Sequence, residues 1–287
     1  MIAGIPPFSL NLARDLLDML AFDFMRSAFL AGGTIALSAG LVGYFVVVRN
    51  QVFTSDALGH VAFTGGLGGV LVGLPLVGAL FGSTIVAALG MGSLGGRARG
   101  RDVAIGTVFA WVLGVGVLFL SLYSSGRSGS GGVLGVSVLF GSLLSLQPGA
   151  AVTTAGAGLL VSAALVALCR PLLFASVDPD VAVARGVPVR LVTAAFLVLL
   201  GATVAEAVQA VGALLIFALL VTPAAVAHNL TARPYAAMAL SAALAVTFVW
   251  LGLAVGFYVA YPVSFFITAL AFVAYLASVG WARLRRS

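Results

Sequence analysis

The chain contains no lysine, and all 14 of its basic residues are arginine. The phosphate-binding loop of the common nucleotide hydrolases, GxxxxGK[ST], needs a lysine that reaches the terminal phosphates. That standard ATP site is therefore excluded from this polypeptide. If ATP drives a process in which the chain takes part, a separate polypeptide has to bind and hydrolyse the nucleotide.

Charged residues are also scarce. They make up 8% of the 287 residues, whereas 62% are hydrophobic, and an ordinary soluble domain carries about a quarter charged residues. A water-exposed surface cannot be built from this composition. The charges fall in short clusters such as 97–102 and 178–190, separated by long uncharged stretches. This spacing predicts an all-α, polytopic integral membrane protein with one transmembrane domain over residues 1–287.

The few cysteines and histidines exclude other classes of protein. Cys169 is the one cysteine, so a disulfide within the chain is excluded. The two histidines, His60 and His228, are far apart and form no HExxH motif, which argues against an intramembrane metalloprotease. The formal net charge of +6 comes from arginines at the ends of apolar runs, a placement that follows the positive-inside rule and does not indicate nucleic-acid binding.

The apolar runs predict about eight or nine membrane crossings. Residues 1–20 mix leucines with polar residues and predict an interfacial amphipathic helix, not a signal peptide. Arg49, the arginines of 97–101 and the basic tail mark cytoplasmic ends, which places the N-terminus outside and the C-terminus inside. A short or re-entrant helix is expected within 133–149. The predicted spans are approximately 21–48, 53–72, 76–94, 105–123, 150–170, 191–207, 209–230, 235–258 and 263–282.

Two ionisable residues interrupt the second predicted span. The sequence SDALGHVAF places Asp56 and His60 on one face of a helix, one turn apart. An ionisable residue inside hydrocarbon costs at least a few kcal/mol, so each is a candidate functional residue. A carboxylate and a neutral imidazole suit Zn²⁺, Mn²⁺ or Fe²⁺; the alternative is an Asp–His hydrogen bond that holds helices together. At 1.5 Å per residue, His60 lies about 16 Å from Arg49, near the middle of the bilayer.

Three further polar residues lie near the ends of predicted spans. Glu206 and Gln209 lie at the outer end of their span, where they could attract cations to an outer mouth, although a solvated helix terminus explains them equally well. His228 lies at the inner end of another span and has no second ligand within one helical turn. This favours a capping or packing role for His228 over metal binding.

Three segments carry a resemblance to a known family. They read VVVRNQVFTSDALGHVAFTGGLGG, VGALLIFALLVTPAAVAHNLT and DPDVAVARGVPVR. The first is similar to a second-helix signature in which a basic turn is followed by D-A-x-S-H-A and L-P-G. The second resembles V-G-x-L-L-x-x-A-L-L-x-x-P-A-A, and the third resembles a cytoplasmic segment D-P-E-x-A-x-x-x-G-x-x-V. These are signatures of the membrane subunits of manganese, zinc and iron ABC importers, and with the span order the resemblance covers nearly the whole chain.

The resemblance implies a fold and a set of partners. The fold would be an ABC importer permease fold related to the cobalamin and siderophore permeases. Two copies of the chain would form a central pathway for Mn²⁺, Zn²⁺ or Fe²⁺ in the inner membrane of a prokaryotic cell. Two cytoplasmic ATP-binding subunits would supply the energy, and an extracytoplasmic metal-binding protein would deliver the ion. The chain itself would be a transport subunit without catalytic residues or a permanently bound cofactor.

The resemblance also assigns residues. Asp56 and His60 map onto the aspartate and histidine of the second-helix signature, which the family associates with metal passage. The segment 176–190 would be a coupling segment that docks on the ATPase, and its short helix would end at a C-cap glycine. The residues assigned to coupling are Asp178, Pro179, Asp180, Ala184, Arg185 and Gly186.

Three positions depart from the family pattern. Gly59 stands where serine is usual, Thr64 replaces the proline of L-P-G, and His228 stands where arginine is common. These departures concern the gate geometry and the preferred metal.

Two other kinds of transporter are alternatives. A permease for a metal chelate, such as a siderophore or cobalamin, would share the architecture but need a wide apolar pathway, and a bulky chelate does not need the ligands of a naked ion. A secondary metal transporter would need intramembrane carboxylates for coupling ions and often has inverted repeats. The chain has no convincing repeat.

Overall fold

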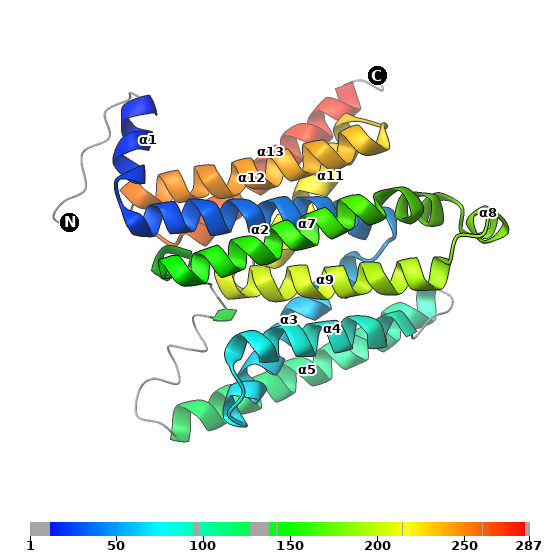
Figure 1. The fold of residues 1–287 in the computed structure, drawn as a ribbon, viewed down its shortest axis with the longest axis horizontal. Helices are drawn as coiled ribbons and strands as arrows, with labels where there is room; N and C mark the ends of the chain where they lie inside the picture. The colour runs from blue at the N-terminus through cyan, green and yellow to red at the C-terminus, as the bar shows by residue number, and fades with distance from the viewer. Residues whose placement is uncertain are drawn as a thin grey trace.

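The computed structural model describes residues 12–93, 98–126, 138–139, 141, 143–213, 215–259 and 261–284, and the regular structure in these ranges is helical throughout. The long helices lie side by side in a bundle (Figure 1). The elements are α1 (Leu12–Leu20), α2 (Asp23–Val48), α3 (Val52–Leu71), α4 (Leu76–Ser93), α5 (Ala98–Gly126), the 3₁₀ turn η1 (Leu143–Ser145), α7 (Pro148–Val177), α8 (Pro179–Ala184), α9 (Val189–Val211), α10 (Ile216–Leu220), α11 (Thr222–Leu230), α12 (Pro234–Tyr258) and α13 (Val263–Leu284).

Seven described helices are long and apolar enough to cross a bilayer: α2, α4, α5, α7, α9, α12 and α13. Helix α3 has 20 residues, about 30 Å of rise, but its polar residues lower its mean hydropathy. Since α2 and α4 both run toward the end of the bundle that carries α8 (Figure 1), α3 has to return the chain across the membrane between them. The predicted all-α polytopic fold is thus confirmed, and the number of crossings agrees with about eight or nine.

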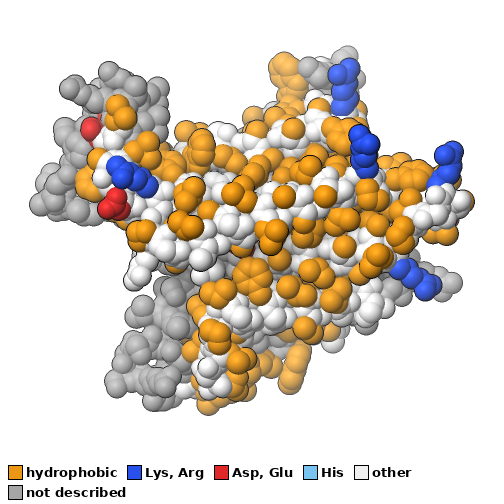
Figure 2. Space-filling model, viewed as in Figure 1, with side chains coloured by type: hydrophobic (Ala, Val, Ile, Leu, Met, Phe, Trp, Pro, Cys, Tyr) orange, Lys and Arg blue, Asp and Glu red, His pale blue; other side chains and the backbone are white. Residues whose placement is uncertain are grey.

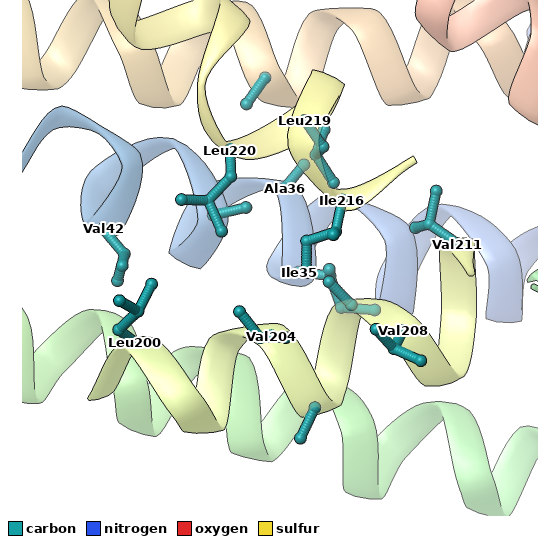
Figure 3. Close-up of a cluster of buried hydrophobic side chains, with 14 of the residues drawn as sticks. Ile35, Ala36, Val42, Leu200, Val204, Val208, Val211, Ile216, Leu219 and Leu220 are labelled. Carbon is teal, nitrogen blue, oxygen red and sulfur yellow. The ribbon is translucent and has the colours of Figure 1, made fainter. Parts of the chain in front are cut away.

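Helix α2 lies at the centre of the bundle. Small residues allow its backbone to approach its neighbours closely, which is how helices associate in lipid. A Cβ at Gly40 would lie 2.6 Å from the Cα of Ala242 on α12, and the Ser241 hydroxyl beside it donates a 2.7 Å hydrogen bond to the Gly40 carbonyl oxygen. A Cβ at Gly43 would overlap the carbonyl oxygen of Leu220 on α10. Figure 3 shows the apolar side chains of α2, α9 and α10 pointing toward one another in this core.

The predicted division at residue 208 is wrong. Helix α9 continues to Val211, where Gly212 adopts a φ of 92° and redirects the chain. The following crossing is made of two short helices, α10 and α11, and Pro223 lies in the first turn of the second, where its missing N–H is not needed. An almost uninterrupted apolar run conceals this break from a hydropathy reading.

Helix α7 is longer than predicted. It continues past Arg170 through Pro171 to Val177, and so reaches directly to α8. A proline inside a membrane helix is tolerated where its surroundings satisfy the freed carbonyl group. The re-entrant helix expected within 133–149 falls mostly outside the described residues; the structure places only Val138, Leu139, Gly141, η1 and the start of α7 there.

The bundle has two distinct ends. One carries α1, and the other carries α8, the end of α13, the last turn of α4 and the first turn of α5 (Figure 1). Figure 2 shows the same view, and most of the arginine side chains visible in it lie at the end that carries α8. Most of the basic residues seen in this view thus lie at one end of the molecule, the pattern that the positive-inside rule expects of cytoplasmic loops, whereas Arg26 pairs with Asp23 at the other end. We refer to the two ends of the bundle as the α1 end and the α8 end.

Candidate functional site

A tight turn at the α8 end positions α3. Arg49 caps α2, Asn50 adopts a left-handed φ of 52°, and the Gln51 N–H donates a 2.8 Å hydrogen bond back to the carbonyl oxygen of Val46. Asparagine is one of the few residues that tolerates this conformation. The turn reverses the chain within three residues and starts α3 at Val52.

Asp56 and His60 lie one turn apart on α3, and both side chains are half-buried. The His60 ring makes an edge-to-face contact with Phe109 of α5, with ring centroids 4.9 Å apart. Phe53, one turn before Asp56, is 41% exposed. Among the described residues, neither Asp56 nor His60 makes a hydrogen bond of standard geometry. The structure therefore gives no support to an Asp56–His60 hydrogen bond as a lock between helices.

The neighbours of Asp56 and His60 on α3 are packed tightly, and Thr64 follows His60 by one turn on the same face. A Cβ at Gly59 would lie 3.0 Å from Cγ2 of Ile216 on α10, so the usual serine of the family would crowd this contact. Thr64 donates a 2.9 Å hydrogen bond from its hydroxyl to the carbonyl oxygen of Val112 on α5. Gly59 and Thr64, which both depart from the family signature, thus have packing roles. Their contacts with α10 and α5 hold α3 in its orientation.

The two side chains do not complete a metal site by themselves. In the part of the chain that the structure describes, no group of three or more histidine, cysteine, aspartate or glutamate side chains could hold a metal ion. Divalent transition metals take four or more ligands in proteins. Any ion at Asp56 and His60 therefore needs further ligands from water or from another polypeptide.

Arg49 connects this region to the segment around α8. Its guanidinium donates hydrogen bonds to the Ser176 hydroxyl (3.1 Å) in the last turn of α7 and to the Thr193 hydroxyl (2.8 Å) in the first turns of α9, and it lies 5.5 Å from the ring centroid of Phe196. Arg49, which lies two residues before the N-cap of α3, thus bonds both of the helices that flank α8. Sequence reasoning assigned Arg49 only to the membrane boundary.

The predicted short helix within 176–190 is present as α8. The Asp178 carboxylate caps its N-terminus by accepting a 3.0 Å hydrogen bond from the Val181 N–H. At its other end Gly186 has a φ of 80°, and the N–H of Val187 donates to the carbonyl oxygen of Ala182. This is the glycine C-cap that the sequence predicted. Pro179, Asp180, Ala184 and Arg185 are exposed on α8 and its cap.

Glu206 and Gln209 lie elsewhere, between α4, α7 and α9. Glu206 is 1% exposed, so it is not a solvated helix terminus. Both residues line a pocket of about 130 Å³ together with Val77, Phe81, Thr153, Thr154 and Ala157, and no residue of α3 lines it.

The remaining candidate residues are packed in the α8 half of the bundle. His228, in the last turn of α11, stacks on Tyr44 with ring centroids 5.0 Å apart, which confirms a packing role. Cys169 is buried, and its Sγ lies 3.7 Å from the Sδ of Met238.

A multi-span helical bundle with ionisable residues within one span is the architecture of a membrane transport protein. The chain belongs to the ABC 3 transport family, which matches residues 21–282. It is therefore a multi-pass membrane subunit of an ABC transporter, a transport component.

Two relatives and two solved structures show how far the similarity extends. The chain is 30% identical over 277 residues to an uncharacterised membrane protein of Synechocystis sp., covering 96% of each. It is 30% identical over 218 residues to the manganese transport system membrane protein MntC of Halalkalibacterium halodurans, covering 75% of this chain and 73% of the relative. The structure of PsaBC from Streptococcus pneumoniae in complex with Fab has a chain that is 27% identical, with a TM-score of 0.81 over 93% of this chain and 95% of that one.

An inward-facing structure of a putative metal-chelate type ABC transporter superposes with a TM-score of 0.71 over 95% of this chain and 91% of that one, at 17% identity. This more distant likeness concerns the fold alone.

Proposed function

We propose that the chain is the permease subunit of an ATP-driven importer of divalent transition-metal ions, with Mn²⁺ as the best-supported cargo and Zn²⁺ and Fe²⁺ as alternatives. The observation that carries the proposal is the half-buried Asp56–His60 pair on α3, whose side chains make no hydrogen bond within the described residues. The relatives named for manganese transport support the choice of cargo.

Two copies of the chain form the pathway in this proposal. Each copy supplies one carboxylate and one imidazole, so two copies supply four donors, which is the minimum that a divalent transition metal needs. The α3 and α5 side of the protomer can meet a second copy, because only 11% of the apolar stretch Ile105–Leu122 of α5 is buried and Phe53 is exposed. Ligation has to be weak, since a tight site would hold the ion instead of passing it on.

The α8 end is the docking site for two cytoplasmic ATP-binding subunits. Valines on and beside α8 are exposed: Val177 by 73%, Val181 by 44% and Val183 by 62%. A groove of about 520 Å³ continues from Val183 to Leu191. Exposed apolar side chains beside arginines, on α8 and at the ends of the spans α7 and α9, suit a protein partner. The α1 end would then face the extracytoplasmic metal-binding protein, with the N-terminus outside and the C-terminus inside a prokaryotic inner membrane.

Arg49 couples the two regions. When the ATPase moves α8, the ends of α7 and α9 move with it, and the hydrogen bonds of Arg49 to Ser176 and Thr193 transmit that motion to the turn that starts α3. The Asp56–His60 face is thereby opened alternately to the two sides of the membrane.

The test is metal uptake by the assembled transporter in proteoliposomes, measured by elemental analysis. Asp56→Asn and His60→Gln preserve the size of each side chain and remove its metal-binding charge or nitrogen. We expect at least a tenfold loss of Mn²⁺ uptake, with assembly and basal ATP hydrolysis kept. The matched controls are Asp23→Asn, a surface carboxylate, and His228→Gln, the other histidine; both should transport normally.

Normal uptake in both Asp56 and His60 variants would refute the assignment. Free Mn²⁺ or Zn²⁺ should also compete with the transported ion. If a metal chelate were transported and free metals did not compete, the chain would be a chelate permease.

A further inference from the structure

Glu206 is a buried carboxyl group that makes no hydrogen bond of standard geometry with the described residues. It is 1% exposed, and neither of its oxygens makes a hydrogen bond in the part of the chain that the structure describes. The ion pair found among the described residues, Arg26 with Asp23, does not involve it. A buried polar group in this state calls for a bound ion or water.

The surroundings of Glu206 make room for its carboxylate. Gly158 of α7 faces it, and a Cβ at that position would lie 2.6 Å from Oε1 of Glu206 and 3.0 Å from the carbonyl oxygen of Thr34. Any larger residue would displace the carboxylate. The adjoining pocket of about 130 Å³ is large enough for an ion and a few waters, since a water occupies about 30 Å³.

The pocket offers only oxygen ligands. Besides the Glu206 carboxylate, these are the hydroxyls of Thr153 and Thr154 and the amide of Gln209. The Thr153 hydroxyl donates its proton to the carbonyl oxygen of Ala150 (2.9 Å), which leaves its oxygen lone pairs available. Oxygen donors without nitrogen or sulfur select hard cations. A single carboxylate balances one positive charge, whereas a divalent ion would leave a buried excess charge at considerable cost.

We propose that Glu206, Gln209, Thr153 and Thr154 form a binding site for an alkali-metal cation, Na⁺ in the first place, which is separate from Asp56 and His60. The bound cation joins α4, α7 and α9 at the end of the bundle away from α8, because its ligands and the walls of the pocket come from these three helices. Oxygen-lined Na⁺ sites of this kind occur at breaks and ends of helices in other membrane proteins. This site is independent of the proposed metal import, and its test needs neither an uptake assay nor the partner ATPase.

The test measures the thermal unfolding of the full-length purified chain in detergent, in NaCl or in N-methyl-D-glucamine chloride at equal ionic strength and fixed pH. We expect Na⁺ to raise Tm by about 2–4 °C in a saturable manner, as a ligand of the folded state does. Glu206→Gln should remove this dependence, whereas Asp23→Asn, the surface carboxylate, should keep it. Equilibrium binding of radioactive Na⁺ should give one ion per chain in the wild type.

A second variant keeps the carboxylate, so the test does not depend on whether Glu206→Gln folds. Thr154→Val has the same shape and removes one oxygen ligand; we expect the Na⁺ concentration at half-maximal stabilisation to rise at least threefold. The proposal is overturned if N-methyl-D-glucamine stabilises as well as Na⁺, if Na⁺ stabilises Glu206→Gln equally, or if Mn²⁺ occupies the pocket in its place. The Mn²⁺ comparison is made in an Asp56→Asn, His60→Gln background, which removes the other metal site.

Discussion

Replacing Arg49 with glutamine should separate ATP hydrolysis from transport. The guanidinium of Arg49 donates two hydrogen bonds, to the hydroxyls of Ser176 (3.1 Å) and Thr193 (2.8 Å). A hydrogen bond to a charged group contributes about 1.5–3 kcal/mol when shielded from water. Because Arg49 is half-buried, solvent weakens both bonds, and we take about 1–2 kcal/mol for each, or about 2–4 kcal/mol for the pair. Each 1.4 kcal/mol changes an equilibrium constant tenfold. The equilibrium constant for the state in which Arg49 joins α7, α9 and the α2–α3 turn should therefore fall by about 30-fold or more.

The assay measures Mn²⁺ transported per ATP hydrolysed by the assembled transporter in proteoliposomes. Arg49→Gln should lower this ratio at least tenfold while basal ATP hydrolysis persists. Arg49→Lys keeps the charge but cannot span both hydroxyls with a planar fork, so its ratio should be intermediate. Arg233→Gln, which removes an exposed arginine at the same end of the bundle, is the control for charge and should have the wild-type ratio.

The hydroxyl partners provide the decisive comparison. The double variant Ser176→Ala, Thr193→Val leaves the guanidinium in place and removes these two hydrogen-bond acceptors. It should reproduce the loss seen with Arg49→Gln. If the double variant transports with the wild-type ratio while Arg49→Gln does not, then Arg49 acts in some other way and the proposed link is wrong.

The remaining predictions concern glycines with defined surroundings. Gly43→Ala should destabilise the fold by about 1–3 kcal/mol or more, because its Cβ would overlap the carbonyl oxygen of Leu220; Gly82→Ala, where nothing lies within 4 Å, is the control, and thermal unfolding in detergent measures both. An equal Tm for the two variants would contradict the packing described. Gly186→Ala should cost about 1–2 kcal/mol at its φ of 80° and raise hydrogen exchange in α8, with the spans unchanged; unaltered exchange there would disprove the role of this cap.

The long helices and the Asp56–His60 face could be predicted from the sequence because both depend on local patterns. Hydropathy identifies a span from its own residues, and a spacing of four residues defines a helix face whatever the helix packs against. The short helix that ends at Gly186 was implied by the family resemblance, and glycine is the usual residue at such a helix end. These features do not require knowledge of the distant parts of the chain.

Features that depend on distant residues could not be predicted. Arg49 bonds Ser176 and Thr193, which are 127 and 144 positions away. The end of α9 is set by the backbone conformation of Gly212, which looks like any other small residue in an apolar run. Glu206 was predicted to lie either at an outer mouth that attracts cations or at a solvated helix end, because its burial is decided by α4 and α7 and not by its own helix. Tertiary contacts override the local pattern at each of these positions.

The central position of α2 has a consequence for how the protein is made. This helix is the first long span of the described chain, yet Ser241, the residue that bonds its Gly40 carbonyl oxygen, follows 201 positions later. At a synthesis rate of about 5–20 residues per second, α2 waits roughly 10–40 s for this neighbour. During that interval its small-residue surface has to remain in the membrane without its final partner. The most buried of the described spans is therefore synthesised and inserted first, before the helices that later surround it.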